Sequence, residues 1–138
     1  MQPEESKPSP FRDMIGAVAE EAGEGYARIS LVLEEKHTNP NGVVHGGVLC
    51  TLMDEVTGWA VMTVRGMEAM LAAPHATVDM NVSFLAGARP GDKLVFEGRA
   101  LRVGRSVAFA EAEVTRPGRE GLVAKGRFTF VIPGRRDG

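Results

Sequence analysis

The longest regular pattern of apolar residues runs from Gly46 to about Arg65. This stretch contains no proline, and its apolar side chains recur three or four positions apart, at Leu49, Leu52, Met53, Val56, Trp59 and Ala60. Such spacing predicts an α-helix with a wide apolar face. We expect a helix this apolar to be enclosed by a sheet rather than to lie on the surface of the molecule.

Shorter segments in which apolar and polar residues alternate predict β-strands. Two precede the helix and four follow it, at residues 17–19, 26–33, 75–85, 93–103, 106–115 and 122–132. The segments between the last four are rich in Gly, Pro and Arg, which is typical of turns between neighbouring strands. The pattern therefore predicts an α+β fold in which about six antiparallel strands wrap one long central helix.

The remaining segments are predicted to contribute less to the fold. Residues 1–10 and 133–138 are rich in charge, Pro or Gly, which favours flexible ends. The apolar residues within 11–15 suit one short amphipathic turn that packs on the core. Residues 66–74 have the composition of a flexible linker. Because no repeat or boundary divides the chain, we expect residues 1–138 to form a single domain.

The composition narrows the class of protein. The chain has 138 residues, of which 43% are hydrophobic, and a formal charge of −2, which fit one compact domain without a bias toward nucleic acid or membranes. No run approaches the ~18 apolar residues of a membrane span, and the N-terminus lacks an apolar signal segment. Cys50 is the single cysteine, so no intrachain disulfide can form. We therefore expect a cytoplasmic protein.

Two features of the predicted helix indicate chemistry. At its start, Gly46 and Gly47 leave backbone N–H groups bare at the positive end of the helix dipole. Farther along, Asp54 is a carboxylate among apolar residues, where charged side chains are rare unless they are paired or functional. Together they suggest an oxyanion site and a catalytic base. The alternatives are a plain tight turn, an acid held by a buried partner, or Glu55 as the functional carboxylate.

The strand at residues 75–85 carries a row of polar residues. Because side chains alternate between the two faces of a strand, these residues are predicted to share one face. They are Thr77, Asp79, Asn81 and Ser83. Most of the row is expected to be a solvated or interfacial face.

The spacing of these residues resembles that of the hotdog-fold acyl-CoA thioesterases, especially the phenylacetate-degradation group. The sequence His-Gly-Gly occupies residues 45–47, Asp54 stands nine positions after the histidine, and Asn39 stands six before it. The strand Thr-Val-Asp-Met-Asn follows at residues 77–81. The resemblance covers roughly residues 11–132, and it implies the hotdog fold and the hydrolysis of an acyl-CoA.

The resemblance also implies a role for each residue of the motif. Asp54 would be the nucleophile or general base, and Gly46 would give an N–H to the oxyanion hole. Asn39 would orient the thioester, and Thr77 would hold the attacking water. A threonine hydroxyl can both donate to and accept from a water molecule, which suits that task.

Further residues are candidates for substrate binding. The turn of Gly104, Arg105 and Ser106 matches the position where relatives meet the pantetheine and nucleotide of coenzyme A, whose phosphates need Arg, Lys or backbone donors. The alternative is a solvated basic face. His45 is expected to fix the loop before the helix by hydrogen bonds, and it is counted with Gly47 among the substrate-binding residues.

We expect no metal site and no cofactor, with coenzyme A present only as part of the substrate. The candidate metal ligands lack the short spacing of a zinc site. They are His37, His45, His75, Cys50 and Asp54.

The acyl group is left open between aromatic, medium-chain and short-chain acids. The linker at residues 66–74 is longer than in close relatives, and Trp59 is large for a helix that borders the acyl pocket. Two other functions are alternatives: a hotdog dehydratase acting on hydroxyacyl thioesters, and a non-catalytic acyl-CoA-binding protein. The dehydratases pair a catalytic histidine with an acid across the site, whereas the nearby histidine here precedes the glycines.

The spacing on the helix predicts a site built from two chains. Gly46 and Asp54 are eight residues apart, hence ~12 Å along the axis. Both must lie within ~3 Å of one thioester group. A second helix, antiparallel across a two-fold axis, would bring its Asp54 to the first chain's Gly46. The resemblance likewise implies a homodimer joined through sheet edges, and a homotetramer built from such dimers.

Overall fold

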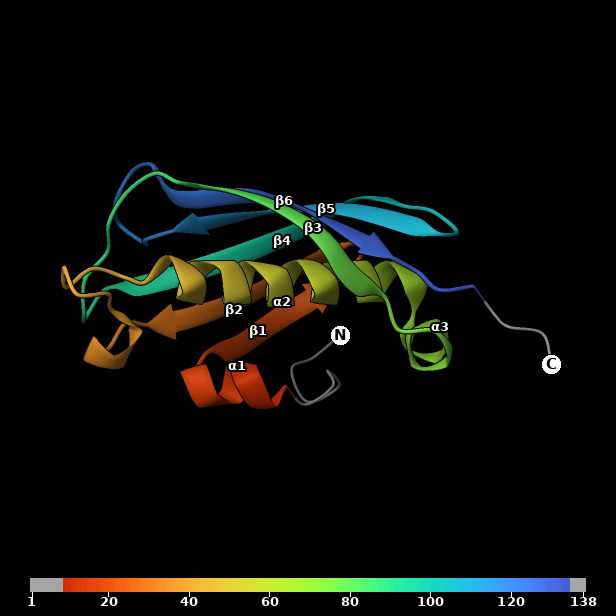
Figure 1. The fold of residues 1–138 in the computed structure, drawn as a ribbon, viewed down its shortest axis with the longest axis horizontal. Coiled ribbons are helices and arrows are strands. Elements are labelled where there is room, and N and C mark those ends of the chain that lie inside the picture. Colours follow the sequence, from red (N-terminus) through yellow and green to blue (C-terminus); the bar gives the residue numbers. More distant parts are fainter. Residues whose placement is uncertain (1–8, 135–138) are drawn as a thin grey trace.

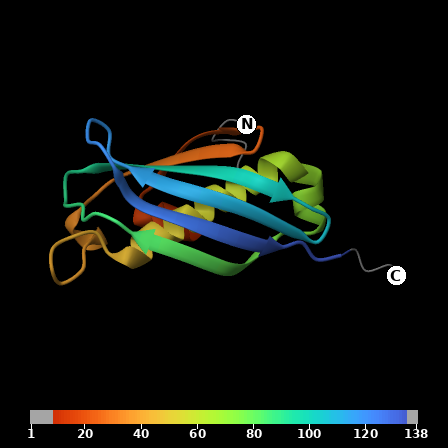
Figure 2. The same cartoon turned by 90° about the horizontal axis from the view of Figure 1, so that it is seen from above.

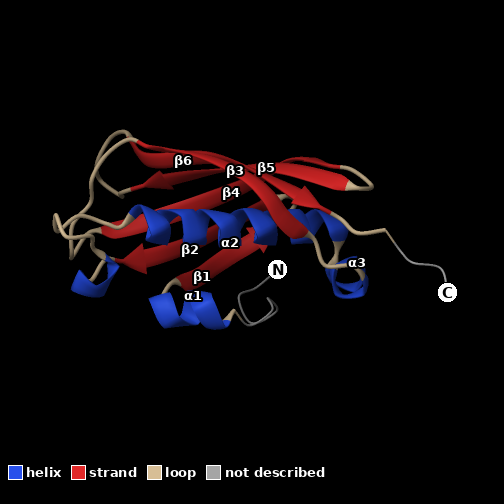
Figure 3. Ribbon diagram, in the orientation of Figure 1, coloured by secondary structure: helices blue, strands red, loops and turns tan. Residues whose placement is uncertain are grey.

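The computed structural model describes residues 9–134. Its elements follow along the chain in the order α1 (Pro10–Ile15), β1 (Val18–Gly23), β2 (Tyr26–Val32), the 3-10 helix η2 (Glu35–His37), α2 (Gly46–Arg65), α3 (Met67–Ala72), β3 (Ala76–Phe84), β4 (Lys93–Val103), β5 (Val107–Thr115) and β6 (Leu122–Val131) (Figures 1 and 3).

The six strands found within residues 9–134 form one antiparallel sheet, in the order β1-β2-β4-β5-β6-β3. The first strand after the helices, β3, pairs with the last strand and forms an edge of the sheet. The long helix α2 runs along one face of the sheet (Figures 1 and 2). The prediction of an α+β fold with one central helix and about six strands is therefore confirmed.

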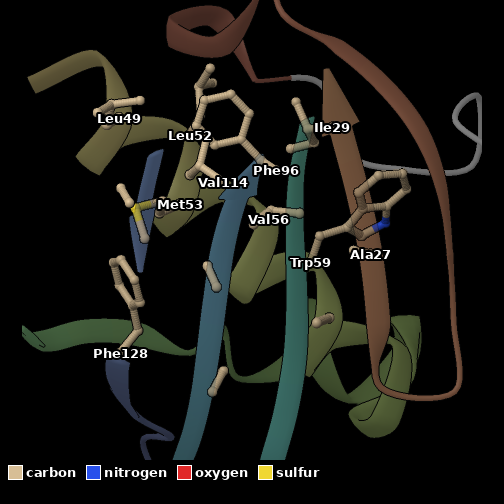
Figure 4. Close-up of a cluster of buried hydrophobic side chains, with 14 of the residues drawn as sticks. Ala27, Ile29, Leu49, Leu52, Met53, Val56, Trp59, Phe96, Val114 and Phe128 are labelled. Atoms are coloured by element: carbon tan, nitrogen blue, oxygen red, sulfur yellow. The ribbon is translucent and has the colours of Figure 1, made fainter. Parts of the chain in front are cut away.

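Apolar side chains from α2 and from the inner face of the sheet form the core. The buried positions recur every three or four residues along α2 and at alternate positions along the strands, as the sequence pattern predicts. The side chains labelled in Figure 4 are Ala27, Ile29, Leu49, Leu52, Met53, Val56, Trp59, Phe96, Val114 and Phe128.

By length and composition alone, α2 would also pass as a membrane span, with a mean hydropathy of 1.2 over 18 residues. In this fold 50% of that window is buried inside the domain. The apolar composition of α2 is thus accounted for by its packing against the sheet.

The N-terminal end of the domain differs from the prediction of a flexible segment up to residue 10. Pro10 is the first residue of α1, and the side chain of Ser9 caps the helix by accepting a hydrogen bond from the Arg12 N–H at 3.4 Å. Proline at the first helical position and serine at the N-cap both favour helix formation. The rest of the predicted flexible ends, at residues 1–8 and 135–138, lies outside the described residues.

Two further segments differ from their predictions. Of the three apolar residues expected to pack on the core, Ile15 is buried, whereas Phe11 and Met14 are 54% and 66% exposed. The linker at residues 66–74, predicted to be flexible, contains the helix α3. Contacts from other parts of the fold hold this short helix in place, as described below.

A β-bulge in β3 places Thr77 on the opposite face of the sheet from Asp79, Asn81 and Ser83. Pairing with β6 runs from Thr77 opposite Phe130 directly to Asp79 opposite Thr129, so Val78 is one extra residue. Phe130 is buried in the core, and Thr77 therefore faces α2, whereas the polar residues from Asp79 onward face away. The prediction that all four share a face was wrong because one inserted residue reverses the alternation.

The strand β4 approaches α2 closely at Gly98. A Cβ atom at this position would lie 2.7 Å from the carbonyl oxygen of Val56, a backbone atom that cannot move without shifting α2. A residue without a side chain is therefore required for the helix to pack this close to the sheet.

Gly98→Ala is expected to destabilise the domain by about 1–3 kcal/mol, the usual cost of overpacking a core. Gly87→Ala is the matched control, because a Cβ there would make only an ordinary contact, 3.5 Å from the Val43 side chain. Urea unfolding measures both variants. Equal free energies of unfolding would show that the close approach at Gly98 does not limit the packing.

Candidate active site

The loop before α2 is folded around the side chain of Asn39. Its Oδ1 accepts hydrogen bonds from the N–H groups of Asn41 at 2.9 Å and Val43 at 3.4 Å. Asparagine side chains that bond the following backbone in this way stabilise tight turns. The carboxamide oxygen is thereby used, whereas its NH2 group makes no hydrogen bond within residues 9–134 and is left to donate to a ligand.

The first turn of α2 leaves the N–H of Gly46 open. His45 is the N-cap, and its Nδ1 accepts a hydrogen bond from the Gly47 N–H at 2.8 Å, so this histidine does fix the start of the helix. The Val48 N–H donates to the His45 carbonyl at 3.0 Å. Among the described residues, the Gly46 N–H has no partner. It lies at the positive end of the helix dipole and suits a developing negative charge.

Asn39 and Gly46 line the same cavity, whose volume is about 400 Å³. Phe84, near the end of β3, forms one wall, and its ring would lie 3.2 Å from a Cβ placed on Gly46. The Phe84 side chain is nevertheless 55% exposed. The loop, the helix start and the end of β3 thus form one half of a candidate site.

The carboxylate of Asp54 lies farther along α2. Its Oδ1 accepts a hydrogen bond from the Thr77 hydroxyl at 2.6 Å. The bulge in β3 turns Thr77 toward the helix and so makes this bond possible. The nearby Thr57 hydroxyl instead donates to the carbonyl of Met53 at 2.8 Å. Asp54 and Thr77, both predicted as site residues, are therefore in direct contact.

A second cavity, of about 250 Å³, opens beside Asp54 and Thr77. Much of its wall is apolar, with contributions from Trp59, Met62, Met70 and Phe130. Glu55 also lines it, and its Oε1 accepts a hydrogen bond from the Ser9 hydroxyl at 2.7 Å. Ser9, Arg12 and His75 line it as well. A hollow that combines apolar walls with convergent polar groups is typical of a small-molecule site.

The two cavities share no lining residue. Within one chain, the half of the candidate site that contains Gly46 is therefore separate from the half that contains Asp54. The separation expected from their spacing on the helix is confirmed. The turn at residues 104–106 lies at the end of the sheet near α3, opposite the loop that carries Asn39 (Figures 1 and 2). Within one chain this turn is not brought to either half, and its contact with coenzyme A stays a prediction.

Comparison with known proteins gives the family. The thioesterase superfamily model matches residues 41–123, which is more than half of the chain. The chain belongs to the thioesterase superfamily. Acyl-coenzyme A thioesterase 13 is 32% identical over 121 residues in its human form, covering 86% of this chain and 82% of that protein. The mouse form is 38% identical over 98 residues, covering 70% of this chain and 66% of that protein.

Solved structures of relatives share the fold. Zebrafish thioesterase superfamily member 2 superposes with a TM-score of 0.80 and 30% identity, covering 92% of this chain and 88% of that one. A mutant of the phenylacetic acid degradation protein PaaI from Thermus thermophilus has a TM-score of 0.78 at 23% identity, covering 89% and 98%. The hotdog fold and the thioesterase family implied by the sequence motif are confirmed.

This thioesterase places His75 in the cavity beside Asp54, a position that the sequence reasoning considered only as a metal ligand. Its Nδ1 lies 3.0 Å from Nη1 of Arg65, and its Nε2 lies 3.0 Å from the carbonyl oxygen of Gly58. Because arginine can only donate, Nδ1 accepts, and Nε2 carries the proton that it donates to Gly58. The signal was present in the sequence, since His75 precedes Thr77 by two positions and so shares its strand face.

Burial is the largest influence on two groups near Asp54. It lowers the pKa of His75 from its ordinary value of 6.5; the hydrogen bond to Gly58 and the charge of Asp54 raise it, and the charge of Arg65 lowers it further. Burial and then the charge of Asp54 raise the pKa of Cys50, which keeps the thiol protonated. Within residues 9–134, no three His, Cys, Asp or Glu side chains gather in a way that would hold a metal ion.

The lowered pKa of His75 predicts a contribution to stability that depends on pH. The unfolded chain takes up a proton on this histidine near pH 6.5, whereas the folded chain does so only at lower pH. The free energy of unfolding should therefore fall as the pH drops through 6.5 toward the pKa in the fold. His75→Gln removes this contribution.

Urea unfolding at several pH values on both sides of 6.5 measures the effect in the wild type and the variant. The wild type should lose more stability than His75→Gln on acidification, because every other titrating group is common to both proteins. Parallel pH dependence in the two proteins would contradict the assignment of a neutral His75.

Proposed function

We propose that this thioesterase hydrolyses an acyl-CoA to the free acid and coenzyme A. The observation that carries the proposal is the hydrogen bond of Thr77 to the Asp54 carboxylate at 2.6 Å, beside a cavity with largely apolar walls. A carboxylate and a hydroxyl held together can position a water molecule and accept its proton. The name of the related human protein, acyl-coenzyme A thioesterase 13, supports a CoA thioester as the substrate.

Two routes use the same groups. In the general-base route, Asp54 accepts a proton from water as the water oxygen attacks the thioester carbonyl carbon, with Thr77 holding that water. In the nucleophilic route, the Asp54 carboxylate attacks the carbon and forms a mixed anhydride, which water then cleaves. In both, the carbon–sulfur bond breaks when the tetrahedral intermediate collapses, and the thiolate of coenzyme A leaves and takes up a proton.

The tetrahedral intermediate carries its negative charge on the former carbonyl oxygen. The open N–H of Gly46 and the unused NH2 of Asn39 are the donors that would bind it. A donor held in advance at this position typically contributes ~3 kcal/mol to the stability of the transition state. No cofactor enters this scheme, and coenzyme A takes part only as a portion of the substrate.

The structure favours Asp54 over Glu55 as the reacting carboxylate. The Thr77 hydroxyl contacts Asp54, whereas Glu55 is held by Ser9, the N-cap of α1. Cys50 is a poor alternative nucleophile, since burial and the nearby Asp54 charge disfavour its thiolate. The apolar cavity walls suit an apolar acyl group, either aromatic or aliphatic.

The proposal includes a second copy of the chain, paired along the free edge of β3. Apolar side chains on this strand are unusually exposed, with Met80 at 45% and Phe84 at 55%. Both lie opposite buried residues of β6 and therefore face the helix side of the sheet, yet the chain's own α2 leaves about half of each exposed. A free strand edge with exposed apolar side chains is a ready surface for pairing with another strand.

Pairing β3 with its own copy would unite the two half-sites. A two-fold axis perpendicular to the sheet pairs the strands antiparallel, so the start of one β3 meets the end of the other. Thr77 and Asp54 are in contact near the start, and Phe84 packs beside Gly46 near the end. The base of one chain would thus lie next to the oxyanion donors of its partner. We extend the proposal to the turn at residues 104–106 as the contact for the phosphates of coenzyme A.

The wild type is expected to release free thiol from at least one aromatic or aliphatic acyl-CoA without added metal. Asp54→Asn keeps the shape of the side chain but removes the base, so kcat should fall by ~10² or more while folding survives. Glu55→Gln is the matched control and should have a much smaller effect. A reversed order of the two effects would exclude Asp54 as the reacting acid, and absence of thiol release from every acyl-CoA would favour a binding protein.

Mixing two inactive variants tests whether the site is shared between chains. Asn39→Ala and Asp54→Asn are unfolded and refolded together, and mass spectrometry verifies that the chains exchange. Each mixed dimer would contain one intact site, so random pairing should recover about a quarter of the wild-type activity. If the chains exchange and no activity returns, each site lies within one chain.

A further inference from the structure

The short helix α3 contributes one residue, Met70, to the wall of the candidate acyl cavity. Asp54, Gly58 and Met62 follow one another along α2 and all line the cavity, which thus extends toward the C-terminal end of α2. There the chain turns at Gly66 into α3 (Figure 1). Met70 of α3 forms part of the cavity wall.

The packing of α3 is weak by itself. It has six residues, and none of them is buried. Met67 and Met70 are partly buried and pack against the core, Ala69 is partly buried, and Leu71 is 58% exposed. A helix of this length is unstable without outside support because nucleation costs more than a few hydrogen bonds return.

Arg65, the last residue of α2, supplies that support. Its Nη2 donates to the carbonyl oxygens of Ala73 at 2.7 Å and Ala69 at 3.3 Å. Ala73 is the C-cap of α3, where helices leave acceptors unpaired and where a positive charge is favourable. The Ala69 carbonyl also accepts a hydrogen bond from the Ala73 N–H at 2.9 Å. The last turn of α3 has no basic residue of its own.

The same guanidinium also joins α3 to β3. Nη1 of Arg65 donates to Nδ1 of His75 at 3.0 Å and lies 3.9 Å from the sulfur of Met70. His75 in turn donates from Nε2 to the carbonyl of Gly58 on α2. The clamp formed by Arg65 and His75 therefore ties α2, α3 and the residue just before β3 into one unit.

We propose that this clamp holds Met70 as the wall that limits the length of the acyl group. The inference rests on the proposed function, since the cavity beside Asp54 must be the acyl pocket. Arg65 and His75 are positioning residues in this scheme, and Met70 is the side chain that meets the end of the acyl chain. Opening the wall should extend the pocket and move the preference toward longer acyl groups.

Steady-state kinetics with straight-chain acyl-CoAs of increasing length tests the wall. Met70→Ala leaves the clamp intact and should raise the ratio of kcat/KM for long over short chains at least ~10-fold, since one methylene in an apolar pocket changes selectivity by roughly 10–200-fold. Arg65→Met keeps an unbranched apolar stem but removes the guanidinium and with it every donor, and it should shift the ratio in the same direction. Leu71→Ala, on the exposed side of α3, is the matched control and should leave the ratio unchanged.

Hydrogen exchange of the backbone amides at residues 67–73 provides a readout that does not depend on activity. Arg65→Met should speed exchange in this segment relative to the wild type, whereas Leu71→Ala should not. Thermal unfolding verifies that each variant is folded. If Arg65→Met leaves exchange at its wild-type rate, Arg65 does not hold α3, and the inference is overturned.

The outcomes for the inference and for the proposed function are distinct. If the wild type hydrolyses acyl-CoAs but Met70→Ala keeps the wild-type length profile, Met70 is not the limiting wall and the inference fails alone. If the wild type releases no thiol from any chain length, the proposed function fails and the acyl-length role fails with it.

Discussion

Burial of α2 against the inner face of the sheet is the interaction on which the rest of the structure depends. The buried stripe of this helix runs from Leu49 to Met62, and its partners come mainly from β2, β4 and β5. Gly98 has no side chain, which allows the helix to pack close to the sheet at this point. Since apolar burial is the main favourable term in folding, the helix cannot turn about its axis without losing much of it. Asp54, at the border of the stripe, is therefore fixed relative to β3.

The same helix separates the groups that the proposed chemistry needs together. Its first turn presents the Gly46 N–H, and its middle presents Asp54, so neither can reach the other's cavity within one chain. Both halves nevertheless touch β3, through Phe84 at one end and Thr77 near the other. In the proposed dimer, one antiparallel pairing of this strand would cover the exposed apolar side chains and complete two sites. Assembly and catalysis would then depend on the same edge.

The sequence was sufficient where structure follows from local periodicity. The apolar spacing predicted α2 and the strands, and the glycines and Asp54 stood out against that pattern. The bulge at Val78 could not be predicted, because it is set by pairing with β6, far along the chain. It reverses the face of Thr77, so the sequence located this residue but not its direction. Likewise, the linker was misjudged although its residues 67–72 are all good helix formers. A helix this short needs outside support, here hydrogen bonds from Arg65, which local composition does not reveal.

The clamp formed by Arg65 and His75 links the cavity wall at Met70 to the residues proposed to react, Thr77 and Asp54. His75 and Thr77 are two residues apart and both face α2, one bonded to the Gly58 carbonyl and the other to the Asp54 carboxylate. Arg65 thus anchors the start of the strand that orients Thr77 as well as the helix that carries Met70. A change in Arg65 or His75 would disturb the wall and the hydroxyl together, whereas a change in Met70 would alter the wall alone. In the proposed enzyme, the side chains of α3 are therefore where acyl preference can vary while the reacting groups stay in place.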